Sequence, residues 1–549
     1  MKIEISKRYR AFAVLSMAIA AVMMGQKGNA RTVTAASCSY SDVTNAAAQA
    51  SPGDVLLLPP GTNTWTQTLT LNGVSLEGSG TNVTVLIDEE PRSAGGQIVI
   101  LYPVAGSLAE ISNLQLHGGV TNTSMNDYGT IDVYGTPGTS WRIDHNIFNG
   151  LYAKVICTYG NSFSVVDHNT FYEKGISVED NSAFPNDGEG DISWSQPATY
   201  GLNSSNVLYV EDNYITNLLG YVASVGACDG EGGGRIVFRH NIVFNDLFNN
   251  HGTETGGRDR SERSFEIYDN SFTFTPNDPS YPCFAAALVR GGSGVIYSNT
   301  ATGYYQFLAL RNYRYTCTYT GQWEPFGGAN GTTAWDSNSP TLYLSGTSSG
   351  PNGSAYLQVS GANWKVNQWY GYTVVNTNSG LFSVVTSNSV NTMYYLGSTT
   401  ATASIIPGSV LTFNTGDPFR IYYVYAALDQ PGRGSGDRVE DDSILPLGWP
   451  AGWLYTIDTV VGVSAWPKQS LEGIYCWSNT LNGVHSEETS AYPGLQAGRD
   501  FYNDTPMPGY VAFAYPHPLV GSSSSSNLVN TNTNTGLQPP SNLQFNGNP

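Results

Sequence analysis

One short line of sequence recurs along the chain and constrains its fold more than any other feature. Each copy is an apolar stretch followed by a polar pair and an Asn, as in residues 141–146 (WRIDHN) and 164–169 (SVVDHN). The seven copies end at Asn146, Asn169, Asn213, Asn241, Asn270, Asn299 and Asn479. Neighbouring copies are 23, 44, 28, 29, 29 and 180 residues apart. Spacings of 23 to 29 residues fit one turn of a solenoid, and 44 fits two turns or one turn with an insertion.

The residues before each Asn alternate between apolar and polar, which is typical of a half-buried strand. Asn tolerates the left-handed backbone of a sharp corner, and its side-chain amide can bond to the Asn of the next turn. Corners stacked at the strand spacing of about 4.8 Å would form a ladder of buried amides. The repeat therefore predicts a parallel β-helix. A β-propeller is the alternative, but its blades need about 40 residues each and an antiparallel meander.

The N-terminal part of the mature chain favours the same fold. Residues 39–51 form an amphipathic helical pattern, and they are followed by PGDVLLLPPGT at residues 52–62, LTL at 69–71 and VSLEGSG at 74–80. These segments resemble the capping helix and first coils of pectate-lyase-like right-handed β-helix proteins. The resemblance implies an all-β, right-handed parallel β-helix with an N-terminal capping helix that covers the open end of the core. It extends to about residue 320 and resumes near residue 419.

We divide the chain into five parts on composition and repeats. Residues 1–30 read as a signal peptide, with a basic start, an apolar run and small residues at the cleavage position; a membrane anchor is the alternative. Residues 31–320 are the cap and main coils, and 419–520 are C-terminal coils. Residues 321–418 contain no copy of the repeat that ends in Asn, and we expect an inserted antiparallel β module there. Residues 521–549 form a flexible Ser/Asn/Thr tail.

Charge is sparse and acidic. Only 12% of the residues are charged and the net charge is -19, which excludes coiled coils and argues against a nucleic-acid or lipid-surface binder. We expect a secreted monomer, extracellular or periplasmic, that is not inserted in a membrane after cleavage. All six cysteines follow residue 30, so disulfides are possible there, with Cys283 and Cys317 the favoured pair. The aromatics Trp364, Trp369 and Tyr370 either form a small core in the module or stack on sugars.

The basic residues gather in one window. Eight of the 19 Arg and Lys residues after residue 30 lie between 235 and 314. Arginines on successive coils would share one face, where they form either an ion-pair network with acidic residues or a surface whose Arg forks bind carboxylate or sulfate groups. In the second case the catalytic candidates are His251, Glu254, Arg258, Arg260 and Arg263. The candidates for substrate binding are Arg239, His240 and Arg290.

The line at residues 141–145 also resembles a Trp-Ile-Asp-His line of pectate lyases, in which the Asp helps to bind Ca²⁺. The resemblance implies a possible Ca²⁺ at Asp144, and we extend it to Asp167 at the same position of the next line. We expect no other cofactor.

These features predict a polysaccharide lyase that cleaves an acidic, uronate-containing polysaccharide by β-elimination. The reaction needs a base, for which His251 in its Gly-rich loop is suited, and cations that neutralise the uronate carboxylate. One alternative is a glycoside hydrolase of polygalacturonase type, with Asp167 and either Glu211 or Glu254 as its carboxyl pair. The other is a non-catalytic cell-surface or adhesion protein that binds glycans.

Overall fold

A computed structural model of the chain describes most of the residues from 30 onward. It covers residues 30–92, 95–121, 128–152, 154–181, 201–218, 226–252, 261–275, 285–311, 323–324, 344–369, 372–395, 410–424, 426–427, 429–434, 471–487, 495 and 497–521. The signal peptide and the tail predicted from the sequence therefore lie outside the described residues. None of the helices in the described part of the chain has the length and apolar character needed to cross a bilayer.

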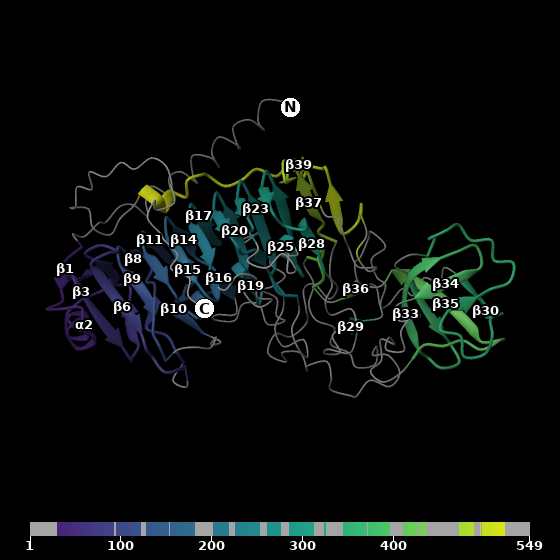
Figure 1. Cartoon of the computed structure of the whole chain (residues 1–549), viewed down its shortest axis with the longest axis horizontal. Helices are drawn as coiled ribbons and strands as arrows, with labels where there is room; N and C mark the ends of the chain where they lie inside the picture. Colours follow the sequence, from purple (N-terminus) through teal and green to yellow (C-terminus); the bar gives the residue numbers. More distant parts are fainter. Residues whose placement is uncertain are drawn as a thin grey trace, which may run out of the picture.

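Three long sheets run side by side along the molecule, and most coils contribute one strand to each of them (Figure 1). Sheet A contains β1 (Thr32–Thr34), β2 (Val55–Leu58), β5 (Ser75–Gly78), β8 (Leu108–Ser112), β11 (Ser140–Asp144), β14 (Phe163–Asp167), β17 (Leu208–Glu211), β20 (Arg235–Arg239), β23 (Ser264–Tyr268), β26 (Ser293–Tyr297), β37 (Ile474–Trp477) and β40 (Phe501–Asn503). Sheet B contains β3 (Gly61–Trp65), β6 (Thr84–Asp88), β9 (Gln115–Gly118), β12 (Ile147–Asn149), β15 (Thr170–Glu173), β18 (Tyr214–Asn217), β21 (Ile242–Phe244), β24 (Ser271–Thr273), β27 (Thr300–Thr302), β38 (Thr480–Leu481) and β39 (Val484–His485).

Sheet C contains β4 (Leu69–Asn72), β7 (Val99–Tyr102), β10 (Gly129–Tyr134), β13 (Lys154–Tyr159), β16 (Ile176–Asn181), β19 (Gly226–Glu231), β22 (Phe248–Asn249), β25 (Ala285–Val289) and β28 (Gln306–Leu310). Strands pair in parallel except β38 and β39, which are antiparallel. Because crossovers between parallel strands are almost always right-handed, successive coils wind in that sense. The predicted right-handed parallel β-helix is confirmed.

The predicted ladder of Asn side chains runs along the corner between sheets A and B. The backbone N–H and the Nδ2 of Asn146 donate to Oδ1 of Asn169 at 3.0 and 3.1 Å, and the pattern repeats coil by coil as far as Asn479. The left-handed position was assigned wrongly, however. It belongs to the residue before each Asn, with φ of 52° at His145 and 53° at His168. The Asn itself is required for the amide ladder.

The first coil is closed by a short helix, α2 (Tyr40–Ala47), as predicted. Ser39 caps the helix by accepting a hydrogen bond from the Asp42 N–H. Val43 and Ala46 are buried against the core of the coils, so the helix covers apolar surface that would otherwise meet water. The four described cysteines are buried free thiols: Cys38, Cys157, Cys228 and Cys476. The favoured disulfide partners, Cys283 and Cys317, lie outside the described residues.

The spacing of 180 residues is one coil with a large insertion, because β26 and β27 pair directly with β37 and β38. The insertion holds a six-stranded antiparallel sheet with its own core, as predicted. Its strands, in sheet order, are β30 (Leu344–Thr347), β35 (Pro418–Val424), β32 (Tyr372–Asn376), β33 (Phe382–Asn388), β34 (Thr392–Tyr395) and β31 (Leu357–Gln358). Two further strands of the insertion, β29 (Trp323–Glu324) and β36 (Ala426–Ala427), pair with each other.

Two expectations about the insertion are decided by these strands. Residues 419–424 were assigned to returning β-helix coils, but β35 pairs with β30 and β32. Among the described residues, the first coil strand after the insertion is β37. The boundary at residue 418 is therefore wrong. A strand of the module and a strand of the β-helix show the same alternation of apolar and polar residues, so the sequence does not distinguish them. Trp364 and Trp369 are buried in the core of the module, as the first of their two interpretations predicts, and Tyr370 lies outside the described residues.

The last described residues form a strap, residues 505–521, which ends in the 3₁₀ helix η4 (Pro518–Gly521). The strap runs back along the outer face of sheet A (Figure 1, yellow). The rings of Phe513 and His517 pack on Tyr209 of β17, with centroids 5.4 and 4.7 Å away. Instead of adding coils up to residue 520, the chain thus covers one of its own sheets.

Candidate functional site

The outer face of sheet C gathers a group of ionisable side chains. In this sheet Cys157 pairs with Glu179, and Glu179 pairs with Asp229. Side chains alternate between the two faces of a strand. Ile156, Val178 and Cys228 belong to the core, so the residues that follow them face outward. The sheet C cluster comprises Lys154, Glu179, Asp229, Glu231 and His251.

Lys154 and His251 bind the carboxyl groups of the cluster from two sides. Lys154 Nζ lies 2.6 Å from Glu179 Oε1 and 3.6 Å from Glu231 Oε1. His251 Nδ1 lies 2.9 Å from Glu231 Oε2, and its Nε2 lies 3.8 Å from Asp229 Oδ2. Glu179 and Asp229 are 1% and 2% exposed, whereas the side chain of His251 is 26% exposed. The imidazole is therefore the accessible edge of a buried acidic group.

The environment shifts the pKa values of Glu179 and Glu231 in opposite directions. Burial, together with the charge of Glu231, raises the pKa of Glu179 well above its usual value. Burial also acts to raise the pKa of Glu231, but its hydrogen bond to His251 and the charges of His251 and Lys154 outweigh burial and lower it. Burial acts to lower the pKa of Lys154, but Glu179 and Glu231 raise it. The cluster thus places two carboxyl groups whose pKa values are shifted in opposite directions beside a lysine whose pKa is raised, an arrangement typical of acid–base sites.

An aromatic strip adjoins the cluster on the same sheet. Tyr102, Tyr134 and Tyr159 stack on successive coils with ring centroids 5.2 and 4.6 Å apart, and all three are half-buried. The register continues from Tyr159 through Asn181 to Glu231, so the strip leads into the cluster. Asp132 lies two residues before Tyr134 and pairs with Cys157, which pairs in turn with Glu179; burial raises the pKa of Asp132 to about 6.

The predicted catalytic residues fall into three groups. His251 belongs to the cluster, whereas Glu254, Arg258 and Arg260 lie outside the described residues. Arg263 is buried and its Nη2 binds Glu472 Oε2 at 2.8 Å. This agrees with the first alternative from the sequence, in which the arginines form an ion-pair network with acidic residues. Among the predicted substrate-binding residues, Arg290 lies near the cluster, where it hydrogen-bonds Asn250, the neighbour of His251.

The other two predicted substrate-binding residues lie on a different sheet. Arg239 is fully buried under the strap, where its Nε donates to Glu211 Oε2 at 2.6 Å and its Nη2 donates to the Ala514 carbonyl at 2.8 Å. The ring of His240 stacks on Tyr515 with centroids 3.7 Å apart. The expectation that Arg239 and Arg290 share one face is wrong. Arg239 ends a strand of sheet A and Arg290 follows a strand of sheet C, and the three-sheet coil keeps these positions apart.

The predicted Ca²⁺ ligands also face outward from sheet A. Arg142 forks onto Asp167, with Nε 2.8 Å from Oδ1 and Nη2 2.6 Å from Oδ2, and it lies 3.4 Å from Asp144. His168 Nδ1 also hydrogen-bonds Asp167 Oδ2, at 2.7 Å. Burial acts to raise the pKa of Asp167, but these two partners lower it. The guanidinium already supplies the positive charge that a cation would bring, so Asp144 and Asp167 do not fit a Ca²⁺ site.

Sequence reasoning missed Lys154, Glu179, Asp229 and Glu231. Their strands carry no Asn line, and the register of sheet C cannot be read from the repeats of sheet A because the turns between the sheets vary in length. The segment Asp229-Gly-Glu231 was the available signal, since two acids at alternate strand positions point to one face.

The chain is a right-handed parallel β-helix protein with an acid–base cluster on one outer face. No protein-family model and no curated protein matches the sequence. Among solved structures it is similar to the PL6 family alginate lyase AlyGC, with 14% identity over 51% of this chain and 40% of that one, and a TM-score of 0.33. It is also similar to a GH87 α-1,3-glucanase from Streptomyces thermodiastaticus, with 14% identity over 52% and 56% of the two chains and a TM-score of 0.30. Each match thus spans less than two thirds of the other chain, and the function has to be argued from this chain's own residues.

Proposed function

We propose that the protein is a polysaccharide lyase whose sheet C cluster cleaves a uronate-containing polysaccharide by β-elimination. One observation carries the proposal: the partly exposed imidazole of His251 is bound through Nδ1 to Glu231 and lies in one cluster with Lys154 and Glu179. No other described histidine has this combination of partners on sheet C.

Elimination removes the proton α to a uronate carboxylate, forms a C4–C5 double bond and breaks the C4–O bond. His251 Nε2 is the base in this scheme. Glu231 fixes the orientation of the ring and stabilises the imidazolium that forms, as a carboxylate does beside a catalytic histidine. The imidazolium then returns the proton to the departing oxygen, so the group is restored after each turnover.

The negative charge that develops on the substrate carboxylate needs donors that stay protonated. Lys154 meets this requirement because its acidic neighbours raise its pKa. Burial raises the pKa of Glu179, which favours its protonated form as a second donor, since a neutral carboxylic acid can donate a hydrogen bond to an enolate-like oxygen. A contribution of Arg258 and Arg260 to this neutralisation stays a prediction from the sequence.

The tyrosine strip supplies a surface for the sugar chain. Tyr102, Tyr134 and Tyr159 present flat, half-buried rings at the spacing of the coils, which suits the apolar faces of consecutive sugar rings. In this orientation the polymer would run along the axis of the β-helix towards His251. The predicted signal peptide agrees with a substrate outside the cell.

Hydrolysis is less compatible with this cluster. Carboxyl groups that hydrolyse a glycosidic bond stand about 5 to 9.5 Å apart, on either side of it. Glu179 and Glu231 instead share one ammonium group, because Lys154 Nζ lies 2.6 Å from Glu179 Oε1 and 3.6 Å from Glu231 Oε1. Of the pairs considered from the sequence, Asp167 binds Arg142 and Glu211 binds Arg239.

The test is an assay on polymers of mannuronate, guluronate, galacturonate and glucuronate, with two readouts. Elimination yields an unsaturated product that absorbs in the ultraviolet, while both elimination and hydrolysis yield new reducing ends. We expect ultraviolet absorbance with at least one polymer, and a loss of 100-fold or more in kcat for His251→Ala, within the range of general base catalysis of roughly 10² to 10⁴.

The matched control is His145→Ala, which removes an exposed histidine on sheet A that also binds a carboxylate. It should keep full activity. Reducing ends without ultraviolet absorbance would make the protein a hydrolase, and inactivity of the wild type on every polymer would refute the lyase proposal and favour a binding protein.

A further inference from the structure

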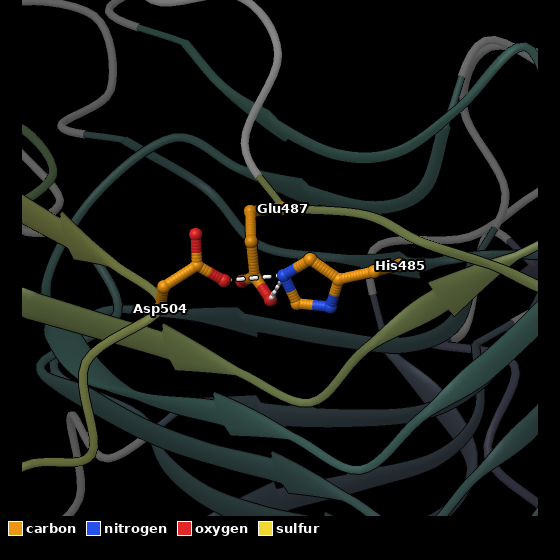
Figure 2. A group of neighbouring side chains, drawn as sticks. All are labelled: His485, Glu487 and Asp504. Atoms are coloured by element: carbon orange, nitrogen blue, oxygen red, sulfur yellow. Dashed lines mark hydrogen bonds and ion pairs between the residues drawn. The ribbon is translucent and has the colours of Figure 1, made fainter.

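Three metal-ligating side chains converge at the last coil, on residues that the proposed reaction does not use. They are His485 at the end of β39, Glu487 two residues later, and Asp504 directly after β40. One ligand atom from each lies within 4.8 Å of the others. Figure 2 shows the Nε2 of His485 directed between the two carboxylates. It contacts Asp504 Oδ1 and lies 3.4 Å from Glu487 Oε1.

Glu487 gives a second, independent indication of a ligand. It is 7% exposed, and neither of its carboxylate oxygens makes a hydrogen bond of normal geometry with the described protein groups, although Asn479 lies close by. A buried carboxylate without satisfied oxygens is costly, so such a group is normally paired or bound to a metal. Glu487 Oε1 faces the Nε2 of His485, which also contacts Asp504.

We propose that His485, Glu487 and Asp504 bind a divalent transition-metal ion, for which Zn²⁺ is the probe. An imidazole together with two carboxylates suits zinc better than calcium, which prefers oxygen ligands alone. The side chains of His485 and Asp504 are 53% and 68% exposed, so ions can enter from solvent and water can complete the coordination.

The position of the site indicates its role. Asp504 directly precedes the first residue of the strap, and the other two ligands belong to the last coil. A bound ion would therefore tie the start of the strap to the end of the β-helix. The inference does not depend on the proposed lyase activity, because the site lies on other residues and its role concerns the fold.

The experiment is a calorimetric titration of the untagged full-length mature protein with Zn²⁺ after treatment with a chelator. We expect saturable binding of one equivalent and a rise in the thermal midpoint. Asp504→Asn and His485→Ala should each weaken binding at least tenfold and remove the thermal shift. Asp504 is an exposed turn residue, so its variant should fold, and far-ultraviolet circular dichroism checks this.

The control is His117→Ala, which removes a half-buried histidine whose ring contacts the Gly118 carbonyl, and it should bind zinc like the wild type. An absence of saturable zinc binding, or equal binding by wild type and His485→Ala, would overturn the proposal and leave an ordinary ion pair.

Discussion

The buried pair of Arg239 and Glu211 makes the clearest prediction about the strap. Both side chains are fully buried, and Arg239 also donates to the carbonyls of Phe513 and Ala514 in the strap. The second oxygen of Glu211 accepts the N–H of His517 at 2.7 Å. The replacement Arg239→Met keeps most of the side-chain volume but leaves a buried carboxylate and two carbonyls without their donor.

Removal of one partner from a buried ion pair destabilises a structure by roughly 3 to 5 kcal/mol. A solenoid does not unfold as one unit, so the loss should appear where the contacts are, in the strap. Since 1.4 kcal/mol is a factor of about ten in an equilibrium constant, the strap should open at least about 100-fold more often. Amide hydrogen exchange of residues 505–521, including the His517 N–H, measures this directly.

Two further variants isolate the cause. Arg263→Met breaks an ion pair away from the strap, with Glu472, and should leave exchange in the strap unchanged. Arg239→Met combined with Glu211→Leu replaces both charges by apolar groups and should restore much of the protection. A change of less than tenfold in strap exchange for Arg239→Met alone would show that aromatic packing, and not this ion pair, holds the strap.

Two other predictions concern the coils. Asn213→Ala removes buried hydrogen bonds to Asn241, Val166 and Glu211, each worth roughly 0.5 to 1.5 kcal/mol, so it should lower the urea midpoint clearly, whereas Asn203→Ala should not. An unchanged midpoint would contradict the ladder's structural role. The native pKa of Asp132 is raised from 3.8 to about 6. Below pH 3.8 the carboxyl is protonated in both the folded and the unfolded state. As the pH rises through about 6, the free energy of unfolding falls, because the unfolded state releases this proton more easily. Asp132→Asn should remove this part of the pH dependence in urea unfolding curves, and identical curves for both proteins would refute it.

The sequence carried a local signal for most coils, and for that reason the fold could be predicted. Each Asn line encodes its own strand and corner, so one copy is recognisable without knowledge of its neighbours. The same locality explains the error at residue 418. Residues 419–424 alternate like a coil strand, but their partner strands lie at residues 344–347 and 372–376.

The candidate site was predictable only in part. His251 stood out as a histidine in a Gly-rich, Arg-rich segment, and the structure places it in the sheet C cluster. Its partner Glu231 lies 20 residues earlier, and Lys154 and Glu179 lie on coils further back. Nothing in the sequence gives the register of sheet C, which depends on how long each turn between sheets is.

The sequence by itself therefore determined the parallel β-helix, its cap, its Asn ladder and the existence of an inserted module, because these depend on residues close together in the chain. Tertiary structure alone decided which charged residues face solvent. Arg239 seemed available for substrate until the strap, more than 270 residues later, was found to cover it. Burial and register are properties of the packed coils. They place Arg239 and Arg263 in structural ion pairs and bring acids from separate coils together in the candidate site.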